Sequence, residues 1–323
     1  MLILSGADLA KALPMGPLVD AVAEAFIEAA RGDAVVPTRV GVPVAEHDAL
    51  LAVMPAYLRS GALATKVNTL FRRNPLSGRP LIQGVVLLCD STTGKPLALF
   101  ESGALTARRT AAGAAVATRA LARDDAGVLA LIGAGLEART HLEAIAAVRT
   151  LREVRVCARS IESARRFAAA AAVTGVIVRA VATAREAIEG ADLIVTVSTS
   201  AEPILSADWI AAGAHVCGIG SHSTGARELD SATVARANVI AVDTMDGCRA
   251  EAGDLLIPIQ EGLITWDGVR LLGDILRGAA PGRQGPTDRT LYKSVGTGLM
   301  DAAAARLAYR LASDTGLGST VEF

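Results

Sequence analysis

The stretch Val128–Ala138 reads VLALIGAGLEA, an apolar strand that runs directly into a glycine turn and the start of a helix. Gly133, Gly135 and Ala138 keep the G-x-G-x-x-A spacing of a dinucleotide-binding turn, in the strand–turn–helix setting that such a turn requires. The first glycine permits the tight turn, and the second lets a pyrophosphate approach the N–H groups that begin the helix. The residues that we expect to contact a dinucleotide are Gly133, Gly135, Leu136 and Glu137.

The pattern around this turn predicts a doubly wound parallel sheet. Strands that are apolar throughout alternate with helical segments, as in parallel sheets covered on both faces. The expected strands are residues 127–132, 153–158, 176–181, 193–197, 215–219, 239–242 and 290–293, and the expected helices are residues 137–148, 162–172 and 184–189.

The preceding part of the chain has a different period. Short alternating segments separated by Gly/Pro turns predict a strand-rich, mostly antiparallel region flanked by helices. The expected strands there are residues 38–42, 49–57, 63–71, 84–89 and 97–101, and the expected helices are residues 16–32, 105–122 and, near the end, 297–312. We therefore expect an α/β protein in which a Rossmann domain, residues 123–294, is inserted into a strand-rich α+β domain, residues 1–122 plus 295–323.

Composition excludes several classes of protein. The 323 residues carry 32 basic and 33 acidic side chains, interspersed along the chain, which gives no electrostatic footprint for nucleic acid. Hydrophobic residues make up 51% and aromatic residues only 3%, yet no apolar run reaches the ~18–20 residues of a membrane span. The beginning, MLILSGADLAKALP, lacks the features of a secretory signal. We expect a cytoplasmic protein that binds neither nucleic acid nor membrane.

Cysteine and histidine spacing gives no sign of a metal site or a disulfide framework. The four cysteines are far apart, form no CxxC pair, and are Cys89, Cys157, Cys217 and Cys248. The four histidines show no HExxH spacing. We expect no bound metal.

The end of the second Rossmann strand predicts which cofactor binds. An NAD site would place Asp or Glu about 20 residues after the turn, where it bonds the ribose 2′-hydroxyl. This chain has Arg159 and Ser160 there, which are able to pair with and donate to a 2′-phosphate. We expect NADP(H) in preference to NAD(H). The alternative is that Arg159 is a solvated surface cation.

Three basic residues of the first domain lie in or beside apolar segments, where an unpaired charge is costly. They are Arg39, Lys66 and Arg109. With no matched acid nearby in the sequence, we expect them to converge on an anionic ligand, for which a substrate carboxylate is the simplest choice. Each of them alone is also compatible with an ordinary ion pair or an edge strand.

Four stretches together resemble one family over almost the whole chain. They are LATKVNTLFRRNPLSGRP, LFESGALTARRTAAGAAVATRALAR, LIGAGLEARTHLEAI and TLYKSVGTGLMDAAAARLAYRLA. The TA-x-RTAA block, the GAG turn and the late KSVG are similar to those of the ornithine cyclodeaminase/mu-crystallin family. The resemblance implies a homodimer whose first part and final helix form the substrate and dimerisation domain. It also implies that Arg39, Lys66 and Arg109 bind a carboxylate, that Thr110, Ser198, Ile219, Gly220 and Ser221 face the cofactor, and that Ser294 and Val295 line the nicotinamide and substrate region.

One segment departs from the cyclodeaminase pattern. Where true cyclodeaminases resemble G-G-D-x-P-G-K, residues 220–226 read GSHSTGA, so His222 replaces the Asp that binds the substrate amine and Ala226 replaces the Lys. An imidazole does not do for an ammonium group what a carboxylate does. The departure points to the reductases of the family.

We therefore expect NADPH-dependent reduction of small α-imino acids, such as the cyclic ketimines 1-pyrroline-2-carboxylate and 1-piperideine-2-carboxylate. Arg39 and Arg109 would hold the carboxylate, and Lys66 or His222 would supply the proton. Open-chain amino-acid dehydrogenation or iminosuccinate reduction, with a second carboxylate at Arg72 and Arg73, stays possible, as does cyclodeaminase activity. A third possibility is an NADPH-dependent ligand-binding protein of the mu-crystallin type. The acids without an assigned role are Glu101, Glu228 and Asp301. Asp301, in the final helix, is either a partner of a basic residue of the site or a charge on the helix surface.

Overall fold

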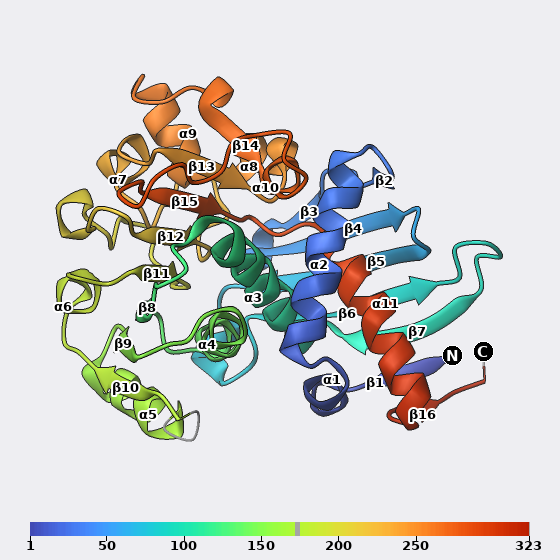
Figure 1. Ribbon diagram of the computed structural model, residues 1–323. Helices are drawn as coiled ribbons and strands as arrows, with labels where there is room; N and C mark the ends of the chain where they lie inside the picture. Colours follow the sequence, from blue (N-terminus) through green and yellow to red (C-terminus); the bar gives the residue numbers. More distant parts are fainter. Residues whose placement is uncertain (172–174, 323) are drawn as a thin grey trace. The chain divides into compact units, whose positions relative to one another are not determined.

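The computed structural model describes residues 1–171 and 175–322 (Figure 1). Its chain divides into two compact units, Met1–Thr110 with Thr297–Phe323, and Ala111–Gly296. The first boundary falls inside one continuous helix, α3 (Ser102–Leu121), and not at its end, where the sequence predicted it. A helix shared by two units has no break in composition or periodicity that would mark the boundary. The second unit is inserted in the chain of the first.

The first unit is built on an eight-stranded sheet. Its strand order is β16-β1-β7-β6-β5-β4-β2, with β3 beside β4, and every described pair is antiparallel except the parallel pair of β1 and β7. The strands are β1 (Leu2–Leu4), β2 (Ala34–Val35), β3 (Val40–Val44), β4 (Ala49–Leu58), β5 (Ala62–Phe71), β6 (Ile82–Cys89), β7 (Pro96–Glu101) and β16 (Ser319–Thr320). The helices of this unit besides the first part of α3 are α1 (Gly6–Ala12), α2 (Met15–Ala30) and α11 (Gly298–Thr315), with short 3₁₀ turns η1 (Ala45–His47) and η2 (Asn74–Ser77).

Helix α11 packs on the middle of this sheet. It contacts β4, β5 and α2, and Figure 1 shows α2 and α11 side by side. The buried positions of α11 are mostly alanines, whose small side chains let the helix approach the strands closely. The close contact brings the first turn of α11 to the central strand β5, which carries Lys66.

The second unit contains an eight-stranded sheet with the order β10-β9-β8-β11-β12-β15-β13-β14. All of its described pairs are parallel, and β11, β12, β13 and β15 are buried at every position. The strands are β8 (Val128–Ile132), β9 (Glu153–Cys157), β10 (Ile177–Ala180), β11 (Leu193–Thr196), β12 (His215–Gly218), β13 (Val239–Val242), β14 (Val269–Leu271) and β15 (Thr290–Lys293). The order reverses between β9-β8 and β11, which is the switch point of a doubly wound sheet. The expected Rossmann sheet, inserted in a strand-rich domain, is confirmed.

Helices connect these strands. They are α4 (Leu136–Val148), α5 (Ile161–Ala171), α6 (Ala184–Ile188), α7 (Ser231–Ala235), α8 (Met245–Glu251), α9 (Gly253–Gln260) and α10 (Leu272–Leu276), with 3₁₀ turns η4 (Ala207–Trp209) and η5 (Trp266–Gly268). The sequence missed α7–α10, β14, β1, β2, β16 and α1. Most of these elements are short, and α9 contains Pro258, so the periodic signal is weak. The last residue of the expected helix at residues 162–172, Ala172, lies outside the described residues.

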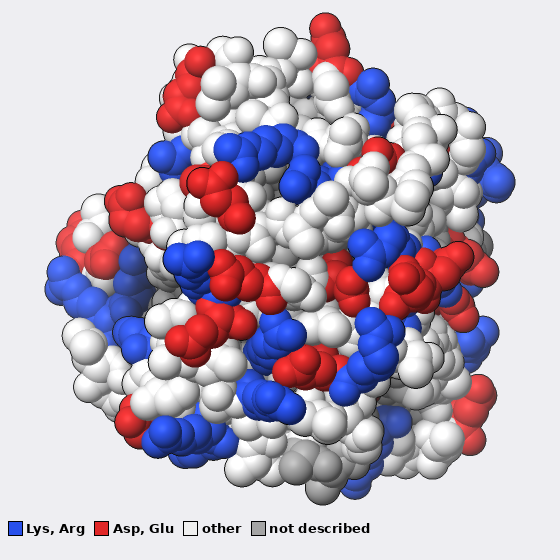
Figure 2. Space-filling view, turned by 60° about the vertical axis from the view of Figure 1, so that its left-hand side comes forward, with Lys and Arg blue, Asp and Glu red and all other residues white. Residues whose placement is uncertain are grey.

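Charged side chains of both signs are interspersed on the face drawn in Figure 2, which agrees with the net charge of −1. Among the residues that the structure describes, no helix is long and apolar enough to cross a membrane.

Candidate active site

A buried charge cluster lies between the central strand and two helices of the first unit. Lys66, in the middle of β5, is 2% exposed, and Asp301, in the first turn of α11, is 1% exposed. The Nζ of Lys66 lies 2.9 Å from Oδ2 of Asp301. The Nε of Arg109, on α3, donates to Oδ1 of Asp301 at 2.8 Å. One carboxylate therefore pairs with two buried cations, so pairing with basic residues of the site is the one of the two interpretations of Asp301 that the structure shows.

The cluster carries an excess of positive charge, and this changes its protonation. Burial, the positive charge of Arg109 and, more weakly, that of Arg39 lower the pKa of Lys66 to about 8, although Asp301 opposes the shift. Burial alone raises the pKa of Asp301, but Arg109 and Lys66 outweigh it and bring that pKa below its usual value. Because the cluster has more cations than anions, an added carboxylate would balance it.

Arg109 has an unused donor. Its Nη1 is buried and makes no hydrogen bond with any residue that the structure describes. A buried N–H without an acceptor costs free energy, so such groups in native proteins usually have a ligand or water as partner. The guanidinium thus offers a donor to an anionic ligand.

Arg39 and Arg72 differ in their surroundings. Arg39 is half-buried and directly precedes β3, and its charge acts on Lys66. Arg72 is more than half exposed and forms an ion pair with Asp48 at 3.2 Å. Arg73 is exposed. Of the basic residues expected in this domain, Lys66 and Arg109 are therefore brought together around Asp301, and Arg39 lies within electrostatic reach.

The glycine turn of the second unit has the shape that its sequence predicts. Gly133 has φ of 131°, and a Cβ there would lie 2.8 Å from the carbonyl oxygen of Val197. A Cβ on Gly135 would meet no heavy atom within 4 Å, so space is open beside its backbone. Helix α4 begins at Leu136 without a side-chain cap, and Leu136 is 58% exposed. An uncapped N-terminus beside open space fits the pyrophosphate of a dinucleotide.

Arg159 and Ser160 follow β9 directly. Arg159 is exposed and makes no hydrogen bond or ion pair with the described part of the chain. The Oγ of Ser160 accepts a hydrogen bond from the backbone N–H of Ser163 at 3.2 Å, so this hydroxyl also caps the start of α5. Arg166 donates to the hydroxyl of Ser163 at 2.9 Å, which adds a second guanidinium close to this strand end.

The residues expected to face the cofactor after β11 and β12 are held by a buried acid. The carboxylate of Glu228 accepts hydrogen bonds from the backbone N–H groups of Ser198 and Gly220, each at 2.7 Å. Between Gly220 and the exposed His222, Ser221 is buried and donates from Oγ to the carbonyl oxygen of Ala226 at 2.6 Å. Ile219 is also buried. Glu228 is a site residue that sequence reasoning left without a role.

A second buried acid holds the segment that leads from β15 toward α11. Oδ2 of Asp243 accepts from Oγ of Ser294 at 2.7 Å and from the backbone N–H groups of Val295 and Gly296 at 3.2 and 2.8 Å. Thr110, by contrast, uses its hydroxyl inside helix α3, where it donates to the carbonyl oxygen of Thr106 at 2.8 Å.

The third unassigned acid has a structural role. Glu101 accepts from the backbone N–H groups of Gly103 and Ala104 at 2.6 and 2.7 Å. It therefore caps α3, the helix that carries Arg109.

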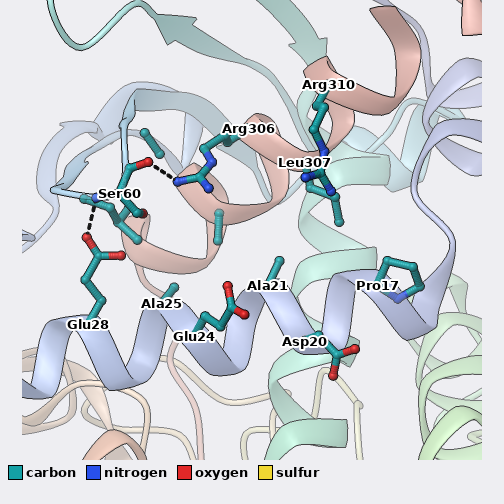
Figure 3. Close-up of a pocket in the computed structure, with 13 residues that line it drawn as sticks. Pro17, Asp20, Ala21, Glu24, Ala25, Glu28, Ser60, Arg306, Leu307 and Arg310 are labelled. Carbon is teal, nitrogen blue, oxygen red and sulfur yellow. Dashed lines mark hydrogen bonds between the residues drawn. The ribbon is translucent and has the colours of Figure 1, made fainter. Parts of the chain in front are cut away.

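A separate groove of about 420 Å³ lies beside α2 and α11 in the first unit (Figure 3). Glu24 and Glu28 on α2 and Arg306 and Arg310 on α11 contribute charged groups to it, and Glu28 accepts from the backbone N–H of Ser60 at 2.7 Å. None of the residues predicted for the site lines this groove. Elsewhere, residues 1–171 and 175–322 contain no group of three or more His, Cys, Asp and Glu that could hold a metal ion.

The model of one family, described as the ornithine cyclodeaminase/mu-crystallin family, matches residues 1–316. The chain belongs to this family. A Delta(1)-pyrroline-2-carboxylate reductase of Bacillus cereus is 34% identical to it over 326 residues, which are 100% of both chains. Ketimine reductase mu-crystallin of Mus musculus is 36% identical over 294 residues, which are 91% of this chain and 90% of the mouse protein.

Solved structures agree with this membership. The structure of Thermococcus litoralis Delta(1)-pyrroline-2-carboxylate reductase in complex with NADH and L-proline has a TM-score of 0.95 and 38% identity, over 99% of this chain and 100% of that chain. An archaeal alanine dehydrogenase dimer with bound NAD has a TM-score of 0.93 and 29% identity, over 100% and 99% of the two chains. The expected closeness to the ketimine reductases of the family, and with it the oxidoreductase class acting on C=N bonds, is confirmed.

Proposed function

We propose that this protein is an NADPH-dependent imine reductase that acts on small α-imino acids, in the first place cyclic ketimines such as 1-pyrroline-2-carboxylate or 1-piperideine-2-carboxylate. The observation that carries the proposal is the buried cluster of Lys66, Arg109 and Asp301, which has one positive charge too many and an unused guanidinium donor. A substrate carboxylate supplies both the missing charge and the missing acceptor.

The first unit binds the substrate. Arg109 donates from Nη1 to the carboxylate, and Arg39 adds a second guanidinium, so the acid is held in one orientation. Asp301 fixes the guanidinium through Nε and leaves the other nitrogens for the ligand. Fixing the carboxylate also fixes the adjacent C=N bond, and such positioning is a large part of catalysis.

The reaction adds a hydride and a proton across the C=N bond. When bound, the reduced nicotinamide supplies the hydride to the imine carbon. Lys66 donates a proton from Nζ to the imine nitrogen, and a pKa of about 8 suits this task because the ammonium is still populated at neutral pH and gives up its proton readily. His222, exposed in the loop after β12, is the second candidate donor.

Arg159 supports the preference for NADPH. Its guanidinium is exposed and unpaired within the described residues at the end of β9, where a 2′-phosphate would lie, and no carboxylate stands there to bond a 2′-hydroxyl. The two solved structures described above hold NADH and NAD. The competing proposal, a preference for NADH, is decided by comparing kcat/KM for the two cofactors.

We further propose a homodimer formed through the strand-rich unit. Its sheet exposes large apolar side chains, which a second copy would cover. They include Val40 and Val42 on β3, Tyr57 on β4 and Val85 on β6. Sedimentation of the purified protein at micromolar concentration tests this, and a monomer there would contradict it.

The four cysteines support action in a reducing compartment such as the cytoplasm. They are free, and three are buried. Structural disulfides are rare in that compartment.

A panel of cyclic and linear imino acids, each tested with NADPH, decides the function. Oxidation of NADPH with cyclic ketimines supports the proposal. Faster turnover with an open-chain imino acid favours the amino-acid dehydrogenase alternative, which the likeness to alanine dehydrogenase supports. Binding of NADPH without turnover of any compound would instead indicate a ligand-binding protein.

A further inference from the structure

Glu228 lies in the segment between β12 and α7 and is fully buried. Its carboxylate accepts three hydrogen bonds from the ends of two neighbouring strands. The donors are the hydroxyl of Thr196 and the N–H of Ser198 at the end of β11, and the N–H of Gly220 at the end of β12, all at 2.7 Å. One side chain thus joins two strand ends, which the backbone hydrogen bond from the N–H of Ile219 to the carbonyl oxygen of Thr196, at 3.0 Å, also connects.

The two strand ends are in direct contact at this point. A Cβ on Gly220 would lie 2.2 Å from the carbonyl oxygen of Ser198 and 2.6 Å from Oε1 of Glu228. The end of β11 also approaches the glycine turn, because a Cβ on Gly133 would lie 2.8 Å from the carbonyl oxygen of Val197. The glycine turn therefore lies against the end of β11, and the end of β11 lies against Gly220.

Glu228 is itself held by a buried ion pair. Oδ1 of Asp254 accepts from the backbone N–H groups of Glu228 and Leu229 at 2.8 and 2.9 Å. Oδ2 of Asp254 lies 2.7 Å from Nζ of Lys293, and the same Nζ donates to the carbonyl oxygen of Ser221 at 2.5 Å. These contacts form a closed circuit through the ends of β12 and β15, and Glu228 connects the end of β11 to it.

Burying the carboxylate of Glu228 costs free energy, and the packing of the core does not require a charged group at this position. Burial raises the pKa of Glu228 even though Ser198, Lys293 and Thr196 all favour its ionised form. An apolar side chain would satisfy the core without burying a carboxylate. A buried carboxylate that binds only backbone and hydroxyl donors at strand ends is instead suited to fixing the positions of those ends.

We propose that Glu228 is a positioning residue that fixes the ends of β11 and β12 for the nicotinamide half of the cofactor. The inference rests on the proposed function, because it requires a nicotinamide dinucleotide to run from the Gly133–Gly135 turn along these strand ends. In doubly wound sheets the ligand lies outside the carboxyl ends of the strands at the switch point, which here is between β8 and β11. In this proposal Glu228 acts on the cofactor through the backbone of Ser198 and Gly220.

The substitution Glu228→Gln tests this with little change in volume. The carboxylate accepts from three donors, whereas an amide has one acceptor oxygen and an NH₂ group that must face at least one of the same donors. At least one strand end therefore loses its partner. The adenosine and pyrophosphate part of the site, around the glycine turn, keeps all of its own contacts.

The readout is the binding of two ligands to the enzyme without substrate. One is the reduced cofactor, NADPH, and the other is 2′-phospho-ADP-ribose, which lacks the nicotinamide. We expect Glu228→Gln to weaken NADPH binding by about tenfold, the equivalent of one lost charge-assisted hydrogen bond, and to leave the affinity for 2′-phospho-ADP-ribose unchanged. The proposal would be overturned if the affinities for both ligands fell equally, or if neither affinity changed.

Two further variants keep the test decisive. Thr196→Val removes only the hydroxyl donor and is expected to cause the same selective loss to a smaller degree, so it serves if Glu228→Gln does not fold. Glu24→Gln makes the same chemical change at an exposed position of α2 and should alter neither affinity.

The two proposals fail in different ways. If the protein binds NADPH but reduces no imino acid, the proposed function is wrong, and the comparison of the two ligands still decides the role of Glu228. If imino acids are reduced and Glu228→Gln binds both ligands as the wild type does, only the positioning role is wrong.

Discussion

Asp301 shows how one residue sets the properties of its neighbours. It pairs with Lys66, 235 positions away in the chain, and with Arg109, 192 positions away. A carboxylate in this position keeps two cations buried, holds Arg109 by one nitrogen, and opposes the loss of the proton from Lys66. The reactivity of the lysine therefore depends on a residue that does not need to touch the substrate.

Asp301→Asn should destabilise the protein strongly. It leaves Lys66 and Arg109 buried without a counter-ion, and breaking a buried pair in this way costs about 3–5 kcal/mol. Urea denaturation measures the free energy of unfolding of each variant. Asp314→Asn, an exposed change on the same helix, should stay within about 0.5 kcal/mol of wild type. A similar small effect for both variants would contradict the buried cluster.

The pH dependence of kcat/KM should report Lys66. As a proton donor Lys66 is active when protonated, so kcat/KM should fall as the pH rises through about 8, the value to which burial and Arg109 lower its pKa. Asp301→Asn removes the charge that opposes this lowering, so the same limb should move to lower pH in any variant protein that folds. A profile that stays flat up to pH 10 would exclude Lys66 as the donor.

The lowered pKa of Lys66 also predicts how the free energy of unfolding depends on pH. Between pH 8 and 10.5 the unfolded chain binds more protons at Lys66 than the folded protein does. The contribution of Lys66 therefore opposes folding most below pH 8, and it is relieved as the pH rises through that window.

Arg159→Ala tests the cofactor preference. Loss of a guanidinium that pairs with a 2′-phosphate should raise KM for NADPH by about 10–100-fold, since hydrogen bonds to charged groups contribute ~1.5–3 kcal/mol. KM for NADH should not change. Arg165→Ala, at an exposed position of α5, is the control. A wild-type enzyme that prefers NADH, with Arg159→Ala behaving in the same way, would contradict the NADPH assignment.

At the level of elements, the sequence predicted what has a strong period and missed what does not. The alternation of β5 and the apolar run of β8 were recognised, because burial of a face or of a whole strand leaves a regular pattern. The segment from α8 to α10 was not, because its helices have five to eight residues and β14 has three. Likewise, Lys66 and Arg109 were recognised as unusual cations, and the sequence left open that Asp301 pairs with a basic residue. Glu228 looks like an ordinary acid until the fold brings its partners to it.

The glycine turn provides a paired test at this scale. A Cβ on Gly133 is strained by its φ of 131° and meets the backbone of Val197, whereas a Cβ on Gly135 meets nothing. Gly133→Ala should therefore lower the melting temperature and abolish cofactor binding. Gly135→Ala should keep the melting temperature of the wild type and still lower the affinity for the cofactor, because its Cβ occupies space that the ligand needs. Unchanged cofactor affinity in Gly135→Ala would contradict the assignment of this turn.

At the level of the whole molecule, the proposed function requires both units of the chain. The strand-rich unit, completed by α11, contains the cation cluster, and the inserted unit contains the glycine turn and the strand ends held by Glu228. Asp301 on α11 follows the whole second unit in the sequence, whereas its partner Lys66 precedes that unit. Membership of the family over residues 1–316 agrees with a single enzyme built from both units.

The most direct test of the account is the rate of NADPH oxidation with 1-pyrroline-2-carboxylate, measured side by side for the wild type, Lys66→Met and the exposed control Lys95→Met. Lys66→Met leaves Asp301 paired with Arg109, so the variant should fold. We expect turnover by the wild type and by Lys95→Met, and a loss of about 100-fold or more in kcat/KM for Lys66→Met, the usual contribution of a general acid. Turnover by Lys66→Met at the wild-type rate, or no oxidation of NADPH by the wild type with any cyclic or linear imino acid, would contradict it.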